Sequence, residues 1–140
     1  MNIPIPELIK SALTARSKAY APYSNYLVSA AVLTNDDRIY SGVNIENASY
    51  GASNCAERTA IFKAVSEGNT KLKAITVVGG AKDKEITDFA YPCGICRQVM
   101  REFCITPDEF IVIVAKNEKE YRTFTLNEIL PASFGPEKLI

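Results

Sequence analysis

The alternation of β-branched runs with helical segments is the feature that most constrains the fold of this chain. Strands are predicted near residues 28–34, 38–43, 74–78, 111–115 and 121–124, and helices near residues 5–20, 54–67, 94–103 and 125–130. A short turn at residues 35–37 joins the first two strands, whereas helices separate several of the later ones. A hairpin followed by β-α-β units predicts a mixed sheet with helices on its faces. We therefore expect an α/β fold, a three-layer α/β/α sandwich around a mixed five-stranded sheet, with residues 1–140 as a single domain.

Local signals set the expected ends of these elements. The apolar residues between Ile5 and Leu13 are spaced to share one face of the first helix. Asn54 is expected to cap the second helix, and Gly68-Asn69 to end it. Gly79-Gly80 is expected to close the third strand.

Three of the four cysteines lie at predicted helix starts. Cys55 begins one helix, and Cys93 and Cys96, spaced as C-x-x-C, begin another. A strand precedes each helix, so both helix starts can meet over one end of the sheet. Free amide groups at a helix N-terminus stabilise negative charge and therefore favour thiolates. Three thiolates would hold a tetrahedral zinc ion and leave one coordination position open, as a catalytic zinc site requires.

Two residues that lie shortly after Cys55, Glu57 and Arg58, are candidates for chemistry beside the metal. Glu57 lies two positions after Cys55, so its carboxylate can lie beside the open position without binding zinc. There it would accept a proton from zinc-activated water and deliver protons to the substrate and its leaving amine. Three thiolates on a dication leave a local charge of minus one. Arg58 is placed to offset that charge by donating to a cysteine sulfur.

The composition removes several other kinds of site. The chain contains no histidine, which excludes a Ser-His or Cys-His nucleophilic pair and any histidine metal ligand. Its 16 basic and 16 acidic residues balance, and a nucleic-acid or membrane-surface protein would normally show a basic excess. The segment Met1–Lys10 lacks the basic start and apolar core of a signal peptide, which predicts a cytoplasmic protein.

Taken separately, each of these signals has an ordinary structural explanation. C-x-x-C also occurs in redox pairs and in structural zinc sites. Cys55 alone would be a buried thiol, and Glu57 alone would be a solvated helix residue. The joint pattern is far more specific. Cys104 matches no ligand position and is interpreted as a buried free thiol.

That joint pattern resembles the signature of the zinc deaminases: a metal ligand, one residue and a glutamate, followed by P-C-x-x-C. Residues 55–57 and 92–96 match it in order. Beyond the signature, the chain is similar to the cytidine deaminases of the small homotetrameric type over nearly its whole length. The stretches that carry this resemblance are Tyr20-Ala21-Pro22-Tyr23-Ser24, Gly42-Val43-Asn44-Ile45-Glu46-Asn47-Ala48, Asn54-Cys55-Ala56-Glu57-Arg58-Thr59-Ala60, Pro92-Cys93-Gly94-Ile95-Cys96-Arg97-Gln98 and Leu130-Pro131-Ala132-Ser133-Phe134.

The resemblance implies a set of substrate contacts. Asn44 and Glu46 would hold the ribose hydroxyls, and Tyr26 would stack on the pyrimidine where the family more often has phenylalanine. Ala56 would also contact the substrate, and Phe134 would reach into the pocket of a neighbouring subunit. On residue types alone, Asn44 would be a turn residue, Glu46 a surface charge, Tyr26 an ordinary aromatic and Phe134 a C-terminal core anchor.

The chain departs from the common family pattern at two further positions. Ser29 stands where glycine is common, which would alter the backbone spacing beneath the stacking aromatic residue. Ile95 stands where a smaller alanine is common and would narrow the base pocket. Arg97 is expected either to brace the cysteine loop or to form an ordinary surface ion pair.

The sequence therefore predicts an enzyme that hydrolyses the exocyclic amine of cytidine and 2'-deoxycytidine in pyrimidine salvage. It would use one Zn²⁺ per chain, act as a homotetramer with sites near subunit interfaces, and bind neither nucleic acid nor membrane. Three alternatives remain: a deaminase of another aminated pyrimidine such as a blasticidin-type nucleoside, a polynucleotide deaminase, and a non-catalytic binding domain stabilised by zinc. A closed site with four protein ligands would favour the last of these.

Overall fold

A five-stranded sheet in the order β2-β1-β3-β4-β5 forms the centre of the computed structural model, which describes residues 2–140. The parallel pair is β3 with β4, and each of the other neighbours is antiparallel. The predicted mixed five-stranded sheet is therefore confirmed. The strands are β1 (Tyr26–Thr34), β2 (Ile39–Val43), β3 (Leu72–Ala81), β4 (Ile111–Ala115) and β5 (Tyr121–Thr125).

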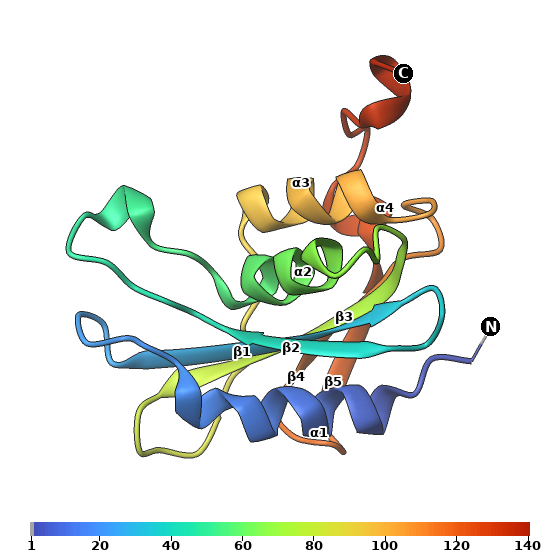
Figure 1. The fold of residues 1–140 in the computed structure, drawn as a ribbon. Coiled ribbons are helices and arrows are strands. Elements are labelled where there is room, and N and C mark those ends of the chain that lie inside the picture. Colours follow the sequence, from blue (N-terminus) through green and yellow to red (C-terminus); the bar gives the residue numbers. More distant parts are fainter. Residues whose placement is uncertain (1) are drawn as a thin grey trace.

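Helices cover both faces of this sheet, so the predicted three-layer α/β/α arrangement is also confirmed. Figure 1 shows one long helix below the sheet and the others above it. The lower layer is α1 (Ile5–Ala15), and the upper layer contains α2 (Ala56–Ser66), α3 (Gly94–Phe103) and the short α4 (Leu126–Ile129). Among the described residues, no helix is long and apolar enough to cross a bilayer.

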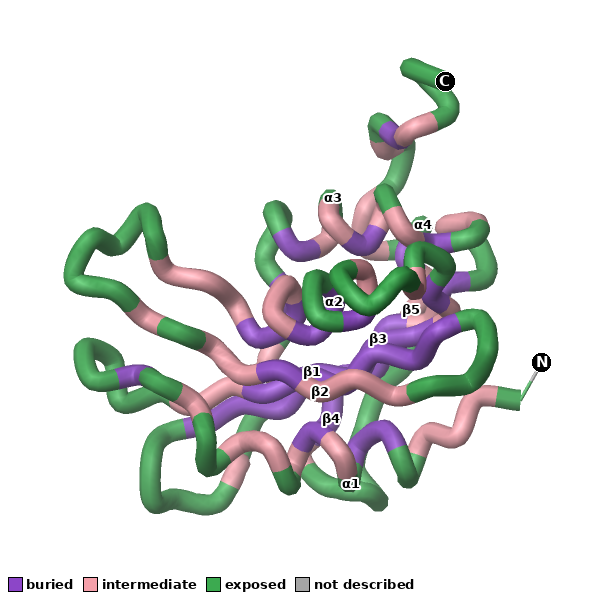
Figure 2. Tube along the Cα trace, viewed as in Figure 1, coloured by how far each residue is buried: buried purple, intermediate pink, exposed green. Residues whose placement is uncertain are grey.

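The alternation of side chains along the strands divides the core into two layers. On β1, Ala30 and Val32 pack toward α2 and α3, whereas Ala31 and Leu33 pack toward α1. Figure 2 shows the buried residues concentrated along the central strands, between the two helical layers. This double burial explains why β4 is a continuous apolar run and why β1 and β3 are predominantly apolar, instead of alternating between polar and apolar residues.

The helix that begins at Cys55 lies unusually close to the sheet. A Cβ atom added to Gly42 on β2 would lie 2.4 Å from the backbone nitrogen of Ala60 on α2. Only glycine permits this approach, because every other residue would place a methyl group inside the helix backbone. Gly42 therefore fixes the distance of α2 from the sheet, and with it the position of the helix start.

Three expected boundaries were wrong. The first helix ends at Ala15 and continues only as a 3-10 turn through Lys18, instead of reaching residue 20. Asn54 does not cap α2: Cys55 occupies the N-cap position without a side-chain capping bond, and the Asn54 amide donates instead to Thr59 Oγ1 at 3.2 Å. Strand β3 continues through Gly79-Gly80, because these glycines pair with Val28 and Leu27 on β1.

Candidate metal centre and substrate cavity

The N-termini of α2 and α3 meet above the sheet and bring the three predicted cysteines together. Cys55 is the N-cap residue of α2, Cys93 is the N-cap residue of α3, and Cys96 lies in the first turn of α3. The Sγ atoms of Cys55 and Cys93 are 4.0 Å apart, and those of Cys93 and Cys96 are 3.5 Å apart. All three sulfurs lie within 4.8 Å of one another.

This spacing fits a zinc ion. Sulfurs bound tetrahedrally at the usual Zn–S length of about 2.3 Å lie about 3.8 Å apart, close to the two separations above. All four cysteines are free thiols, so none of the three is consumed by a disulfide. In residues 2–140, no other group of three or more histidine, cysteine or acidic side chains is arranged to hold a metal, so this cluster supplies three ligands and not four. That donor set leaves a coordination position for water or substrate.

Arg58 supplies positive charge directly to the sulfur cluster. Its Nη2 atom donates to Cys55 Sγ at 3.3 Å. A hydrogen bond from Cys96, together with the Arg58 guanidinium, lowers the pKa of the Cys55 thiol to about 5. The hydrogen bond with Cys55 and burial raise the pKa of the Cys96 thiol. The cluster therefore already stabilises a thiolate at Cys55, and this thiolate is the protonation state in which cysteine binds metal.

Glu57 lies on the first turn of α2 and is only 4% exposed. Burial raises the pKa of its carboxyl group to about 7, and the nearby Cys55 contributes in the same direction. A carboxyl group with a pKa near neutrality can both accept and release a proton under physiological conditions. Within residues 2–140, no side chain forms a hydrogen bond with the Glu57 carboxylate, and Glu57 lines the cavity, so its carboxylate can contact a bound ligand.

A cavity of about 450 Å³ opens beside these groups, which is the size expected for a small-molecule site. Of the predicted substrate contacts, Tyr26, Asn44, Glu46 and Ala56 line it, together with Glu57. Sequence reasoning missed half of the lining: Val28, Ser53, Asn54, Val77, Phe89, Ala90 and Tyr91. A signal for some of them exists, since Val28 shares a strand face with Tyr26, and residues 89–91 directly precede the cysteine motif.

Asn44 and Glu46 are held in place by backbone groups of the first strand and the loop before it. The Asn44 amide accepts from the Val28 N–H at 3.0 Å and donates to the Tyr26 carbonyl at 2.9 Å. The Glu46 carboxylate accepts from the backbone N–H and the hydroxyl of Ser24 and from the Tyr23 N–H, and these bonds lower its pKa. Both side chains are therefore preorganised at the cavity edge, and each keeps unused hydrogen-bonding capacity.

Comparison with known proteins shows which family combines this cysteine cluster and cavity. Residues 5–114 match the family model for the cytidine and deoxycytidylate deaminase zinc-binding region. The chain belongs to this deaminase family. It is 46% identical over 132 residues to the cytidine deaminase of Halalkalibacterium halodurans, covering 94% of this chain and 95% of the relative. The predicted family membership is confirmed.

Solved structures of cytidine deaminases share the fold of this deaminase chain. The crystal structure of cytidine deaminase from Burkholderia pseudomallei is 45% identical, with a TM-score of 0.80 over 91% of this chain and 97% of that one. The enzyme from Mycobacterium tuberculosis is 33% identical, with a TM-score of 0.77 over 96% and 99% of the two chains. The fold and the family are thus supported independently, by structure and by sequence.

Aromatic residues form one wall of the deaminase cavity, and basic side chains support them from behind. The guanidinium carbon of Arg122 lies 4.4 Å from the centre of the Phe89 ring, and Lys116 Nζ lies 4.8 Å from it. Arg122 also donates to the Tyr91 hydroxyl at 2.9 Å. These contacts fix the irregular segment that leads into Cys93, so the aromatic wall and the metal ligand share one support.

The departures from the family pattern have little effect on the deaminase cavity. Ser29 faces α1, on the sheet face opposite the cavity, and its hydroxyl donates to the Ala12 carbonyl at 2.5 Å. The expected disturbance beneath Tyr26 is therefore wrong, because alternate residues of a strand point to opposite faces. Ile95 is 62% exposed and does not line the cavity, so the expected narrowing of the pocket was also wrong.

The remaining predicted residues lie outside the cavity of their own chain. Phe134 is 58% exposed and is not part of the cavity lining. Arg97 braces the cysteine loop, because it donates to the Pro92 carbonyl at 2.8 Å and to the Ile129 carbonyl at 2.7 Å. Cys104 is a buried free thiol whose pKa is raised by burial. The predicted nature of Cys104 is confirmed.

Proposed function

We propose that this chain, residues 1–140 as one catalytic domain, hydrolyses cytidine and 2'-deoxycytidine to the uridine products and ammonia. One observation carries the proposal: three cysteine sulfurs at zinc spacing and a buried glutamate converge at one cavity large enough for a nucleoside. The relatives named cytidine deaminase support the same reaction. The three-sulfur donor set argues against a purely structural zinc, which would have four protein ligands.

Cys55, Cys93 and Cys96 would hold the zinc ion. When bound, the ion would supply a water nucleophile at neutral pH. The thiolates place a net charge of minus one around the metal, and Arg58 partly offsets it through its bond to Cys55. Arg58 is therefore proposed to tune the site rather than to contact the substrate.

Glu57 is proposed to carry the protons of the reaction. Its carboxylate would remove a proton from the attacking water, protonate the pyrimidine ring nitrogen, and later protonate the departing amine. The raised pKa suits this sequence, since the same group must be a base in one step and an acid in the next. Burial around Glu57 also limits proton exchange with bulk solvent.

The substrate would be oriented by the cavity edge. Tyr26 is proposed to stack on the pyrimidine, and Asn44 and Glu46 to hydrogen-bond the ribose hydroxyls. Ala56 offers backbone groups at the N-terminus of α2, where N–H groups have no partner within the helix. Phe134 is proposed to complete the pocket of a neighbouring subunit in a homotetramer.

We further propose a cytoplasmic enzyme of pyrimidine salvage that binds neither nucleic acid nor membrane. The balance of 16 basic and 16 acidic residues supports this, because polynucleotide binding depends on a basic surface. Exposed aromatic residues around the cavity mouth support assembly through this region; they include Tyr23, Tyr50 and Tyr91, which are 51%, 79% and 47% exposed.

The decisive experiment compares Glu57→Gln with Glu67→Gln, an exposed control at the other end of α2. Both variants should bind one zinc per chain. When the loss of cytidine is followed by its change in ultraviolet absorbance, Glu57→Gln should lower kcat by about 10²–10⁴-fold, while Glu67→Gln should keep the wild-type kcat. Glu57→Gln with near-wild-type turnover would exclude the proton-transfer role. Zinc-loaded wild-type protein that consumes neither nucleoside would favour another aminated pyrimidine, or a non-catalytic zinc domain.

A further inference from the structure

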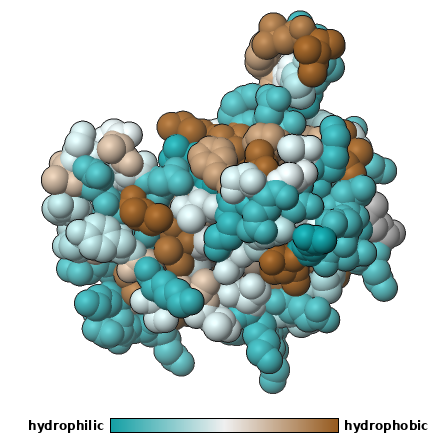
Figure 3. Space-filling view, viewed as in Figure 1, coloured by the Kyte–Doolittle hydropathy of each residue, from teal (hydrophilic) through white to brown (hydrophobic). Residues whose placement is uncertain are grey.

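The segment that follows α4 extends away from the body of the protein, yet its polar groups are tied to α3. Figure 1 shows this C-terminal tail, defined here as residues 131–140, rising above the upper helical layer. Its last two side chains, Leu139 and Ile140, are 78% and 99% exposed, and Figure 3 shows a hydrophobic tip standing apart from the mixed surface below. Such a segment would be poorly ordered without specific anchors.

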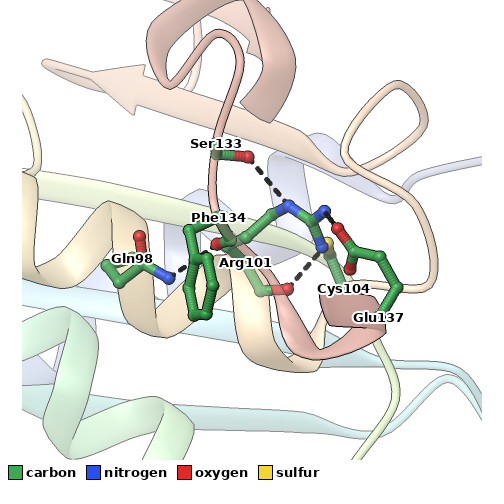
Figure 4. A network of polar contacts seen from close by, with 6 residues as sticks. All are labelled: Gln98, Arg101, Cys104, Ser133, Phe134 and Glu137. Atoms are coloured by element: carbon green, nitrogen blue, oxygen red, sulfur yellow. Dashed lines mark hydrogen bonds and ion pairs between the residues drawn. The ribbon is translucent and has the colours of Figure 1, made fainter. Parts of the chain in front are cut away.

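Arg101 provides most of those anchors. Its Nε atom donates to Ser133 Oγ at 2.8 Å, and its Nη2 atom pairs with the Glu137 carboxylate at 2.5 Å. One turn earlier on α3, Gln98 Nε2 donates to the Phe134 carbonyl at 2.9 Å. Figure 4 shows the tail passing around the guanidinium, with bonds on both sides of it. The Arg101 side chain is only 11% exposed, whereas the Glu137 side chain is 52% exposed, so the guanidinium is shielded from water while the carboxylate stays solvated.

Gly135 lets the tail approach this guanidinium. A Cβ atom added at residue 135 would lie 2.3 Å from both Cζ and Nη1 of Arg101, and 2.5 Å from Nη2. The guanidinium thus occupies the space that a side chain at this position would fill. Arg101 could yield to a methyl group only by giving up its bonds to Ser133 and Glu137. Gly135 and Arg101 therefore form one unit, in which the guanidinium keeps its position only while residue 135 has no side chain.

Phe134 lies between these anchors, but its own ring is 58% exposed. The bonds on either side of Phe134 therefore fix the position of its backbone without burying its ring in this chain. We propose that Arg101 is a positioning residue, whose guanidinium holds the segment from Ser133 to Glu137 on α3 and thereby sets where Phe134 is presented. The inference rests on the proposed function in one respect, namely that Phe134 completes a neighbouring subunit's pocket.

The helix that holds the tail is also the helix that begins with the metal ligands. Cys93 and Cys96 lie at the start of α3, and Arg101 lies near its end. Arg97 links the two regions, since it bonds the carbonyls of Pro92, before the first ligand, and Ile129, just before the tail. One rigid helix therefore sets the positions of both the metal site of its own chain and the aromatic residue offered to the next.

A double-mutant cycle tests the positioning role. Arg101→Ala and Gly135→Ala each break the unit, and the double variant leaves room for the added methyl group. Hydrogen exchange of the tail amides in the zinc-loaded protein should be at least about tenfold faster in each single variant. The exchange rate in the double variant should equal the rate in Arg101→Ala alone, because independent effects would instead multiply the two fold-increases. Arg38→Ala, an exposed arginine in the β1–β2 turn, is the matched control and should leave exchange unchanged.

Kinetics separate positioning from general destabilisation. Arg101→Ala should raise KM for cytidine about tenfold with kcat within a few-fold of wild type, because the tail adds binding rather than proton transfer. Arg101→Lys should bring KM only part of the way back to the wild-type value, since an ammonium group cannot make both bonds in the same geometry. Should Arg101→Ala fail to fold, Ser133→Ala combined with Glu137→Ala removes both side-chain acceptors of the Arg101 guanidinium from the tail.

Three outcomes would overturn the inference. Unchanged tail exchange in Arg101→Ala would show that Arg101 is not the anchor, whatever the enzyme's activity. Faster exchange with unchanged KM would show that the position of the tail does not matter for the site. Equal losses in kcat and in zinc content would reveal a merely structural role. A wild-type protein inactive on both nucleosides would instead sink the proposed function, while the exchange data would still test the anchor.

Discussion

Substitution of Gly42 by alanine should damage the metal site from the opposite side of helix α2. The added Cβ would lie 2.4 Å from the Ala60 nitrogen, about 1 Å short of ordinary van der Waals contact. The neighbouring atoms at residues 59 and 60 are backbone, so no side chain can rotate away, and α2 itself must move. Cys55 and Glu57 lie at the start of that helix and would move with it.

The expected size of the effect follows from that displacement. Overpacking of this kind costs about 1–3 kcal/mol of stability, which lowers Tm by roughly 3–12 °C in a chain of this length. A shift of about 1 Å in catalytic groups can cost on the order of 10²-fold in rate. We therefore expect Gly42→Ala to lower kcat/KM for cytidine by about that factor, with weaker zinc retention in the presence of a competing chelator.

Gly51→Ala is the matched control, because a Cβ atom at residue 51 would meet nothing within 4 Å. The assay is thermal unfolding of the zinc-loaded protein together with steady-state kinetics on both variants. Wild-type stability and activity in Gly42→Ala would refute the close-approach argument. A lower Tm with full activity would show that β2 yields instead of α2, and would refute the link between this glycine and the site.

Three further predictions follow from the same structure. Cys96→Ala should abolish zinc binding, measured as metal per chain after dialysis, because two remaining thiolates cannot hold the ion; full retention would remove Cys96 from the ligand set. In native protein, Cys104 should alkylate much more slowly than in urea, because burial both shields its thiol and raises its pKa, and mass spectrometry of iodoacetamide-treated protein checks this. The backbone N–H of Glu137 and the Arg101 guanidinium lower the pKa of the Glu137 carboxyl group. The stabilisation that the Glu137 carboxylate gives the tail is therefore fully present above the unfolded pKa of about 4.3, and it is lost as the pH falls through the lower pKa of the folded protein. Tail hydrogen exchange, corrected for its intrinsic pH dependence, should therefore accelerate in acid in wild type but not in Glu137→Gln.

The layers and the metal cluster could be predicted because they depend on short-range patterns. Apolar runs marked the strands, and Cys55 and the C-x-x-C pair each mark the start of a helix that follows the sheet. Strand β3 was cut short because Gly79-Gly80 looks like a turn. In the fold the absence of a side chain at Gly79 makes room for neighbouring side chains, since a Cβ at this position would lie 3.1–3.3 Å from atoms of Val28, Ala90 and Tyr26. That reason is visible only once β1 and β3 are paired.

The parts that could not be predicted depend on contacts between distant segments. Arg97 and Arg101 are ordinary helix residues in the sequence, and nothing local shows that they bond carbonyl and hydroxyl groups some thirty positions away. Asn54 illustrates the opposite error: its residue type favours a helix cap, but Cys55 occupies that position. Capping preferences are modest, about 1 kcal/mol, and the Asn54 side chain bonds Thr59 Oγ1 instead.

The aromatic residues around the cavity also give the protein an optical property. The chain contains seven tyrosines and no tryptophan, so tyrosine emission is not masked or drained by energy transfer to an indole. Tyr26 and Tyr91 line the cavity, and Tyr23 and Tyr50 line the adjoining hollow at its mouth. Most of the intrinsic fluorophores are thus gathered at the entrance through which a ligand must pass. Ligand occupancy should therefore be readable from unlabelled protein, by following tyrosine fluorescence during a titration.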